Sequence, residues 1–234
     1  MTFKKFHLCF ILSTSILFSQ NPREEIMTLV CECFEQGTAE SAGQLKLDLL
    51  TTCFDFSAVN TRKLVEELVR KEIDTTNIGD KSYYEIGYEF GQKLALDLQK
   101  PMVQNCDSYF NFFREMKKEM IVNLKKGTNK KTTDSLKTLF KKDDWSPDVM
   151  WKIGAYQLHI GKLSRAEKSF KKCLSKDPKH LQSNFFLALV YEQKGDYSSA
   201  ISSYNQVIAQ PDNSMIAIAN MFLEVALRES MEEE

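Results

Sequence analysis

The chain has 234 residues, of which 43% are hydrophobic, so it is long enough to bury one sizeable core or two smaller ones. Its formal net charge of −1 excludes the strongly basic composition that is typical of nucleic-acid-binding proteins. Only nine glycines and five prolines are present, and apolar residues recur at helical spacing through most of the length. Together these features predict an all-α protein.

The first 19 residues have the pattern of a secretory signal peptide. Two lysines at positions 4 and 5 precede an apolar run from Phe6 to Phe18, which is short for a bilayer core of about 30 Å. The ending Leu-Phe-Ser-Gln resembles signal peptides of Bacteroidetes-type Gram-negative bacteria, and cleavage after Ser19 would leave Gln20 first. We therefore expect a periplasmic or secreted protein with no membrane span after cleavage. The alternative is an N-terminally membrane-anchored protein that keeps this segment.

Residues 20–126 are expected to form an N-terminal helical domain. Apolar stripes at helical spacing predict five helices, at about residues 22–35, 45–53, 60–69, 83–100 and 106–124. Gly37 is expected to end the first helix, and Pro101 the fourth. Gly87 and Gly91 share one face of the fourth helix, where each costs about 1 kcal/mol relative to alanine. That cost predicts a close approach of another helix backbone at this face.

Four cysteines of this domain are expected to form two disulfides in an oxidising compartment. A bridge between Cys31 and Cys33 is disfavoured, because residues two apart on a helix point about 200° from each other. Each should therefore pair separately with Cys53 or Cys106, in either combination. A zinc site with four thiolates is the alternative, but the paired C-x₂-C spacing of structural zinc is missing. We expect no metal and no cofactor.

Residues 127–146 are interpreted as a Lys-rich linker. The stretch Lys125–Lys142 carries seven lysines and one aspartate, while the regions on both sides carry more acidic than basic side chains. A solvated linker, with a short helix at 134–142, is the simplest interpretation. The alternative is a weak contact between these lysines and an anionic surface.

An internal period of 34 residues begins after a strong helix start signal at Ser146, Pro147 and Asp148. Residues of similar size recur at this spacing: Gly154 with Ala188, Gly161 with Gly195, Ala166 with Ala200, and Phe170 with Tyr204. The pattern resembles the tetratricopeptide repeat, whose small-residue positions are matched by Gly154, Ala188, Ala166 and Ala200. The resemblance implies a domain over 147–230, with helical hairpins at about 147–180 and 181–212 and a capping helix at 214–230.

The resemblance also implies a concave groove lined by the first helix of each hairpin, which we call helix A. Trp151 and Phe185 fall at the same repeat position, and aromatic anchors of this kind suit a bound peptide or helix. Asp148 and Gln182 would begin the groove in the two hairpins. The residues expected to bind the partner are Trp151, Ala155, Leu158, His159, Phe185, Leu189, Glu192 and Gln193.

Sequence motifs of common enzyme classes are missing. No G-x-S-x-G, H-E-x-x-H, P-loop or dinucleotide fingerprint occurs. His159 and His180 have no catalytic partner nearby in the sequence, and Cys173 falls at a small buried repeat position, where packing is the expected role. We therefore predict an exported, non-enzymatic module that binds a protein or peptide, and no nucleic acid. The alternative is a structural cell-envelope protein whose groove is covered by its own N-terminal domain.

Overall fold

The computed structural model describes residues 21–40, 48–55, 59–73, 82–124, 134–135, 138, 146–211 and 213–233. The regular structure in these ranges is helical, with no strand, which confirms the predicted all-α class. The predicted signal peptide and most of the Lys-rich linker lie outside the described residues. The proposed domain boundaries therefore remain predictions.

Ten α-helices occur in the described ranges. Five lie in the N-terminal half, with these bounds: α1 Pro22–Glu40, α2 Asp48–Cys53, α3 Val59–Glu72, α4 Tyr83–Asn105 and α5 Asp107–Asn123. The other five follow the linker: α7 Pro147–His159, α8 Leu163–Lys176, α9 Leu181–Glu192, α10 Tyr197–Ile208 and α11 Ile216–Glu232.

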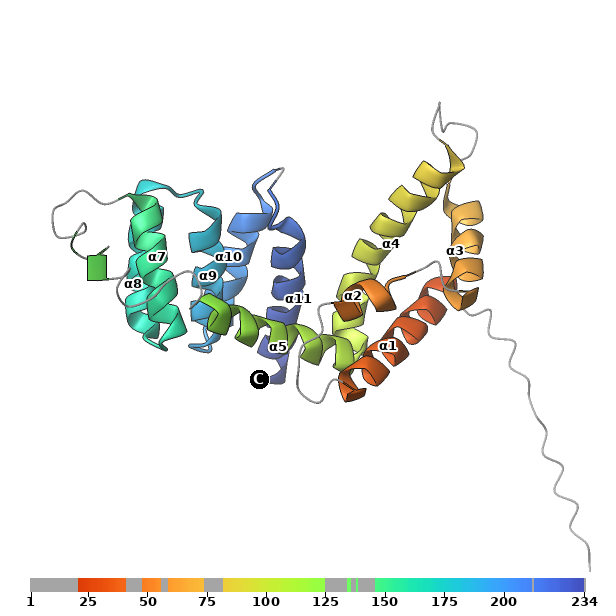
Figure 1. The fold of residues 1–234 in the computed structure, drawn as a ribbon, viewed down its shortest axis with the longest axis horizontal. Coiled ribbons are helices and arrows are strands. Elements are labelled where there is room, and N and C mark those ends of the chain that lie inside the picture. Colours follow the sequence, from red (N-terminus) through yellow and green to blue (C-terminus); the bar gives the residue numbers. More distant parts are fainter. Residues whose placement is uncertain are drawn as a thin grey trace, which may run out of the picture.

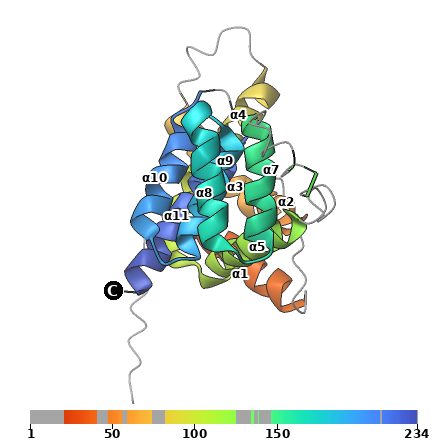
Figure 2. The ribbon, with the colours of Figure 1, turned by 90° about the vertical axis from the view of Figure 1, so that its left-hand side faces the viewer.

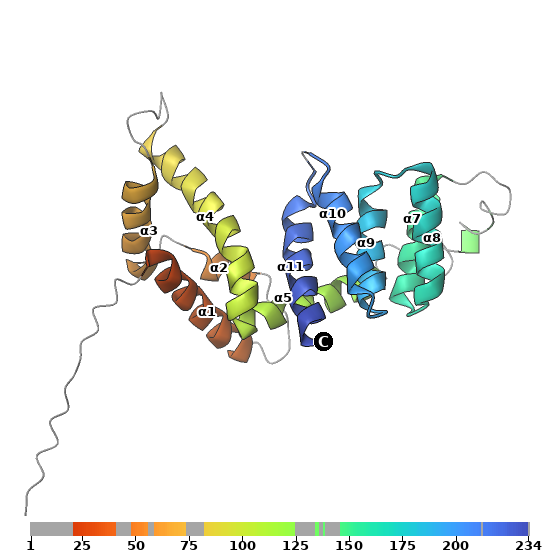
Figure 3. The same cartoon turned by 180° about the vertical axis from the view of Figure 1, so that it is seen from behind.

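The helices form two groups that α5 joins (Figure 1). α7 to α11 stand side by side in one row, and α1 to α4 form the second group at the other end of the molecule. α5 runs from the second group beneath the row toward α7. Figure 2 looks along the row and places α5 on the same side as α7, with α10 on the opposite side. Figure 3 shows from behind that α11 is the member of the row that faces α4.

Local sequence signals explain where several helices begin. The Ser82 hydroxyl accepts a hydrogen bond from the Glu85 backbone N–H, and the Glu85 carboxylate accepts one from the Ser82 backbone, which completes a capping box for α4. Ser146 caps α7 through the Val149 backbone N–H, with Pro147 in the first turn. The start signal predicted after the linker is thus confirmed.

Two disulfides connect the helices of the N-terminal group. Cys31 is bonded to Cys106, and Cys33 is bonded to Cys53. This pairing agrees with the expectation that Cys31 and Cys33 pair separately, and it decides between the two combinations left open. Cys106 lies between α4 and α5, where its sulfur accepts a hydrogen bond from the Tyr109 backbone N–H at 3.4 Å. The first bridge therefore fixes α1 to the junction of these two helices.

Aromatic side chains fill the core beside these bridges. Phe34 of α1 meets Tyr109 and Phe112 of α5 edge to face, with ring centroids 4.9 and 5.3 Å apart. All three side chains are almost fully buried. Edge-to-face geometry is favourable for aromatic pairs and adds to the effect of burial. α5 is therefore part of the core of the N-terminal group, and these ring contacts fix its position relative to α1.

Three expectations about glycine and proline were wrong. Gly37 does not end α1 but lies inside it, where a Cβ would stand 2.2 Å from a methyl carbon of Leu49, so the glycine permits close packing of α2. Pro101 also lies inside its helix, and α4 continues to Asn105. At Gly87, apart from its own helix backbone, no atom of the described residues lies within 4 Å of where a Cβ would stand, so the expected close approach of a helix is absent from this part of the chain.

Candidate partner-binding surface

The row of helices is built from two hairpins and a final single helix. α7 packs on α8, α9 packs on α10, and α11 packs against α10. Gly161 and Gly195 end the turns within the two hairpins, with φ values of 69° and 73°. Glycine adopts this left-handed conformation without strain, which explains its recurrence 34 residues apart. By the same spacing, α11 stands where helix A of a third hairpin would lie.

Close packing within the first hairpin depends on Gly154. A Cβ at this position would lie 2.6 Å from a ring carbon of Phe170, which is fully buried in α8. Trp151 packs beside the same ring, with centroids 6.4 Å apart, and stacks on Phe186 of α9 at 5.2 Å. The tryptophan therefore bridges the two hairpins and is only half-buried.

The predicted groove residues differ widely in exposure. Four of them are buried between helices: Ala155, Leu158, Phe185 and Leu189. Two are half-buried, namely Trp151 and His159. The side chain of Glu192 is nearly buried, with 9% of its surface exposed, and Gln193 is exposed. The four buried residues pack within the protein itself, because neighbouring helices of the row and α5 surround them. Asp148 and Gln182, at the start of α7 and α9, are exposed.

α5 crosses the C-terminal ends of α7, α9 and α11, which are helix A of the two hairpins and the helix at the corresponding place after them. Lys117 of α5 is buried, and its Nζ lies 2.8 Å from Glu192 Oε2 of α9 and 3.3 Å from Glu229 Oε2 of α11. The ammonium also lies 5.5 Å from the ring centroid of Phe222. Burial raises the pKa of Glu192, and the nearby Lys117 acts in the opposite direction.

Two further contacts attach the N-terminal helices to the row. His159, the last residue of α7, places Nδ1 3.3 Å from the carbonyl oxygen of Ile121. Arg228 of α11 donates a hydrogen bond to the Val103 carbonyl at 2.8 Å, pairs with Asp107, and stacks over Phe110 at 4.1 Å. The side of α7, α9 and α11 that carries the predicted groove, here called the A-helix face, is thus covered at its C-terminal end.

Two residues at this junction, His159 and Glu192, were predicted from the sequence as groove residues, whereas Lys117 and Arg228 were not predicted. Lys117 follows Phe113 by four residues and Phe110 by seven, so it stands on the apolar stripe of α5. A lysine at such a position is a signal for a buried charge that needs an acidic partner. The sequence gives no sign, however, that this partner lies 75 residues away.

The described residues offer no group of three or more His, Cys, Asp or Glu side chains arranged to hold a metal ion. Within the same ranges, no helix combines the length and the apolar character needed to cross a membrane. Cys173 is a buried free thiol next to Met150 and Ile153, in agreement with the packing role expected for it. Burial raises the pKa of this thiol above its ordinary value.

Among solved structures, one chain described as "Crystal structure of MamA protein" is 14% identical, with 90% of this chain and 86% of that chain covered and a TM-score of 0.38. No curated protein matches. Residues 181–210, which span α9 and α10, match the family model described as "Tetratricopeptide repeat". The chain is therefore a helical protein that carries a tetratricopeptide repeat in its second hairpin, the kind of repeat that mediates protein interactions.

Proposed function

We propose that this chain is an exported, non-enzymatic interaction module that binds a peptide or helix of a partner protein on its A-helix face. The observation that supports the proposal is the position of α5. Its polar contacts with α7 and α9 are made at His159 and Glu192, the last residues of those helices. At the N-terminal end of the same face, Asp148 and Gln182 are exposed and Trp151 is only partly buried. A partner would bind there.

Export is supported by the two disulfides, since such bonds persist in oxidising compartments. The predicted cleavage after Ser19 gives a direct test. We expect intact-mass measurement of the protein from a periplasmic or secreted fraction to give a chain that begins at Gln20. A mass that retains residues 1–19 would support the anchored alternative.

Photo-crosslinking tests the location of the partner site. A photoreactive amino acid at Gln182 reports on the A-helix face, and the same amino acid at Lys168, an exposed residue of α8, is the matched control on the other side of the hairpin. We expect a discrete crosslinked protein with the probe at Gln182 and a much weaker product at Lys168. Equal products at both positions would contradict a site on the A-helix face.

A structural role is the second candidate, because the network around Lys117 joins three helices of two groups and is mostly buried. In that case the repeats serve to complete the protein's own core. The crosslinking experiment separates the two candidates, since a purely structural protein should give no discrete product at Gln182. Substitution of Lys117 would then damage folding without releasing any partner.

A further inference from the structure

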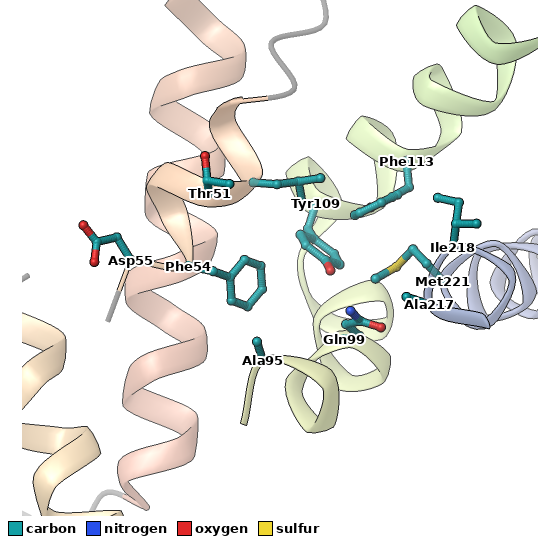
Figure 4. Close-up of a pocket in the computed structure, with 11 residues that line it drawn as sticks. Thr51, Phe54, Asp55, Ala95, Gln99, Tyr109, Phe113, Ala217, Ile218 and Met221 are labelled. Atoms are coloured by element: carbon teal, nitrogen blue, oxygen red, sulfur yellow. The ribbon is translucent and has the colours of Figure 1, made fainter. Parts of the chain in front are cut away.

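A pocket of about 630 Å³ lies where the two groups of helices meet (Figure 4). Phe54, from the end of α2, and Tyr109 of α5 face Met221 of α11 across it, and Ala95 and Gln99 of α4 form another wall. Most of the lining is apolar. Small-molecule sites in proteins are mostly apolar, have volumes of about 300–1,000 Å³ and often lie between domains. Both the size and the position of this pocket therefore suit a ligand.

This pocket is separate from the A-helix face. Ala219 and Leu223 of α11 lie one 34-residue period after two groove residues of α9. Successive residues of a helix are rotated by about 100°, so these two positions point away from the side of α11 on which Met221 lines the pocket. A molecule bound in the pocket would therefore leave the A-helix face free.

The hydroxyl of Tyr109 lies in the wall of the pocket and can donate a hydrogen bond. The residue is 1% exposed, and Figure 4 shows its oxygen directed toward Gln99 and Met221. Among the residues that the structure describes, none accepts a hydrogen bond from this hydroxyl. Burial raises the pKa of Tyr109 well above its usual value, so the group stays protonated at neutral pH. An unpaired hydroxyl in an apolar site is unfavourable, which indicates that a bound molecule supplies the acceptor.

The other polar groups of the lining restrict the charge of the ligand. The Gln99 amide can both donate and accept hydrogen bonds. Asp55 already has an interaction partner within the chain, and its carboxylate points away from Tyr109 and Met221 in Figure 4. No basic side chain is among the lining residues, all of which the structure describes. An ionised ligand would lose its hydration there without gaining a counter-charge, so the lining suits an uncharged molecule.

The α2 side of the pocket is held in place by the protein itself. The disulfide between Cys33 and Cys53 joins α1 to the last residue of α2, directly before Phe54. The Phe54 ring packs edge to face against Tyr109, with ring centroids 6.0 Å apart. A wall that is fixed before binding reduces the conformational entropy that is lost when a ligand binds.

We propose that this pocket binds an uncharged, largely apolar small molecule whose ester or amide carbonyl accepts a hydrogen bond from the Tyr109 hydroxyl. The apolar part of the molecule lies against Phe54, Phe113 and Met221, and the Gln99 amide provides a second polar contact. Because Met221 belongs to the row and the other three side chains belong to the N-terminal group, the ligand contacts both groups of helices at once. Binding should therefore stabilise the folded chain.

Fluorescence titration with N-phenyl-1-naphthylamine, an uncharged apolar dye, tests the pocket. We expect saturable binding to the oxidised full-length chain. Competitors with the same ten-carbon chain then test the charge of the ligand: methyl decanoate, decanoate and decylammonium. Methyl decanoate should displace the dye at a concentration at least about tenfold lower than either ion, because only the ions lose hydration without gaining a counter-charge.

Variants of the full chain locate the bound molecule. Ala217→Phe places a large ring at an exposed position of the pocket lining, and should weaken dye binding at least about tenfold because it fills the space. Ala209→Phe, at an exposed position directly after α10, is the matched control and should leave dye binding unchanged. Tyr109→Phe keeps the ring and removes only the hydroxyl. It should weaken methyl decanoate binding about fivefold and leave dye binding unchanged, because the dye has no carbonyl acceptor.

Each other outcome would overturn the proposal. A chain that binds no dye saturably has no ligand site of this kind, and dye binding that Ala217→Phe leaves unchanged lies elsewhere. Decanoate that competes as well as methyl decanoate contradicts an uncharged ligand, and an ester that binds equally well to Tyr109→Phe contradicts the hydrogen bond. Circular dichroism checks the fold of each variant; if Ala217→Phe does not fold, the comparison of ester and dye in Tyr109→Phe still decides. Crosslinking at Gln182 reports on another side of the molecule, so failure here leaves the proposed A-helix site intact.

Discussion

Gly154→Ala should destabilise the protein, although alanine is the better helix-forming residue. The added Cβ would lie 2.6, 2.8 and 3.0 Å from three ring carbons of Phe170, where unstrained carbon contacts are about 3.5–4.0 Å. The ring is fully buried and must move by about 1 Å against Trp151. Overpacking of this kind costs about 1–3 kcal/mol, and the gain in helix propensity is about 1 kcal/mol. The expected net loss is therefore up to about 2 kcal/mol.

Urea unfolding followed by circular dichroism measures this change, and Gly87→Ala is the matched control. Gly87 is exposed inside α4 and a Cβ there meets nothing among the described residues within 4 Å, so this variant should gain up to about 1 kcal/mol. Phe170→Leu combined with Gly154→Ala should be less destabilised than the sum of the single variants, because the smaller side chain relieves the clash. Equal stabilisation by both alanines would contradict a clash between residue 154 and the Phe170 ring.

Three further predictions concern charge and covalent structure. Lys117→Met should destabilise the chain by about 3 kcal/mol in urea unfolding, since two carboxylates lose their buried partner, whereas Lys118→Met on the exposed side of α5 should change little. Burial raises the pKa of Glu192 above 4.5, so the folded chain holds the proton of this carboxyl more tightly than the unfolded chain does. The contribution of Glu192 to the free energy of unfolding should therefore fall as the pH rises above about 4.5. Glu192→Gln should make the free energy of unfolding less dependent on pH in this range. Mass spectrometry should show a gain of four protons on reduction; no gain would contradict both bridges.

The repeat region could be predicted from the sequence because its signals are local. Ser146, the left-handed glycines and the small residues 34 positions apart each determine structure within one or two turns of the chain. The exclusion of a bridge between Cys31 and Cys33 also rested on a local signal, because the two residues are only two positions apart on one helix. Which of the remaining cysteines each would meet depended on how α1, α2 and α4 pack together, and the spacing alone could not decide it.

The sequence left open whether the N-terminal domain covers the groove, and it could not say where, because the covering depends on contacts between distant residues. Pro101 was expected to end its helix, yet α4 continues for one more turn and brings Val103 to Arg228. Lys117 meets Glu192 and Glu229 only because α5 crosses three helices at once. The pocket beside α11 has the same origin, since its walls come from four helices of both groups.

The contacts of α11 make the order of the helices along the chain differ from their order in space. The last helix returns to α4 and α5 through pairs 125 and 112 residues apart, so the row of hairpins is closed at its end by the first half of the chain. An open repeat array unfolds in steps, because each unit contacts only its neighbours. Here the N-terminal half should fold early and provide the surface on which α11 completes the row. We therefore expect one cooperative unfolding transition, with the two halves losing structure together.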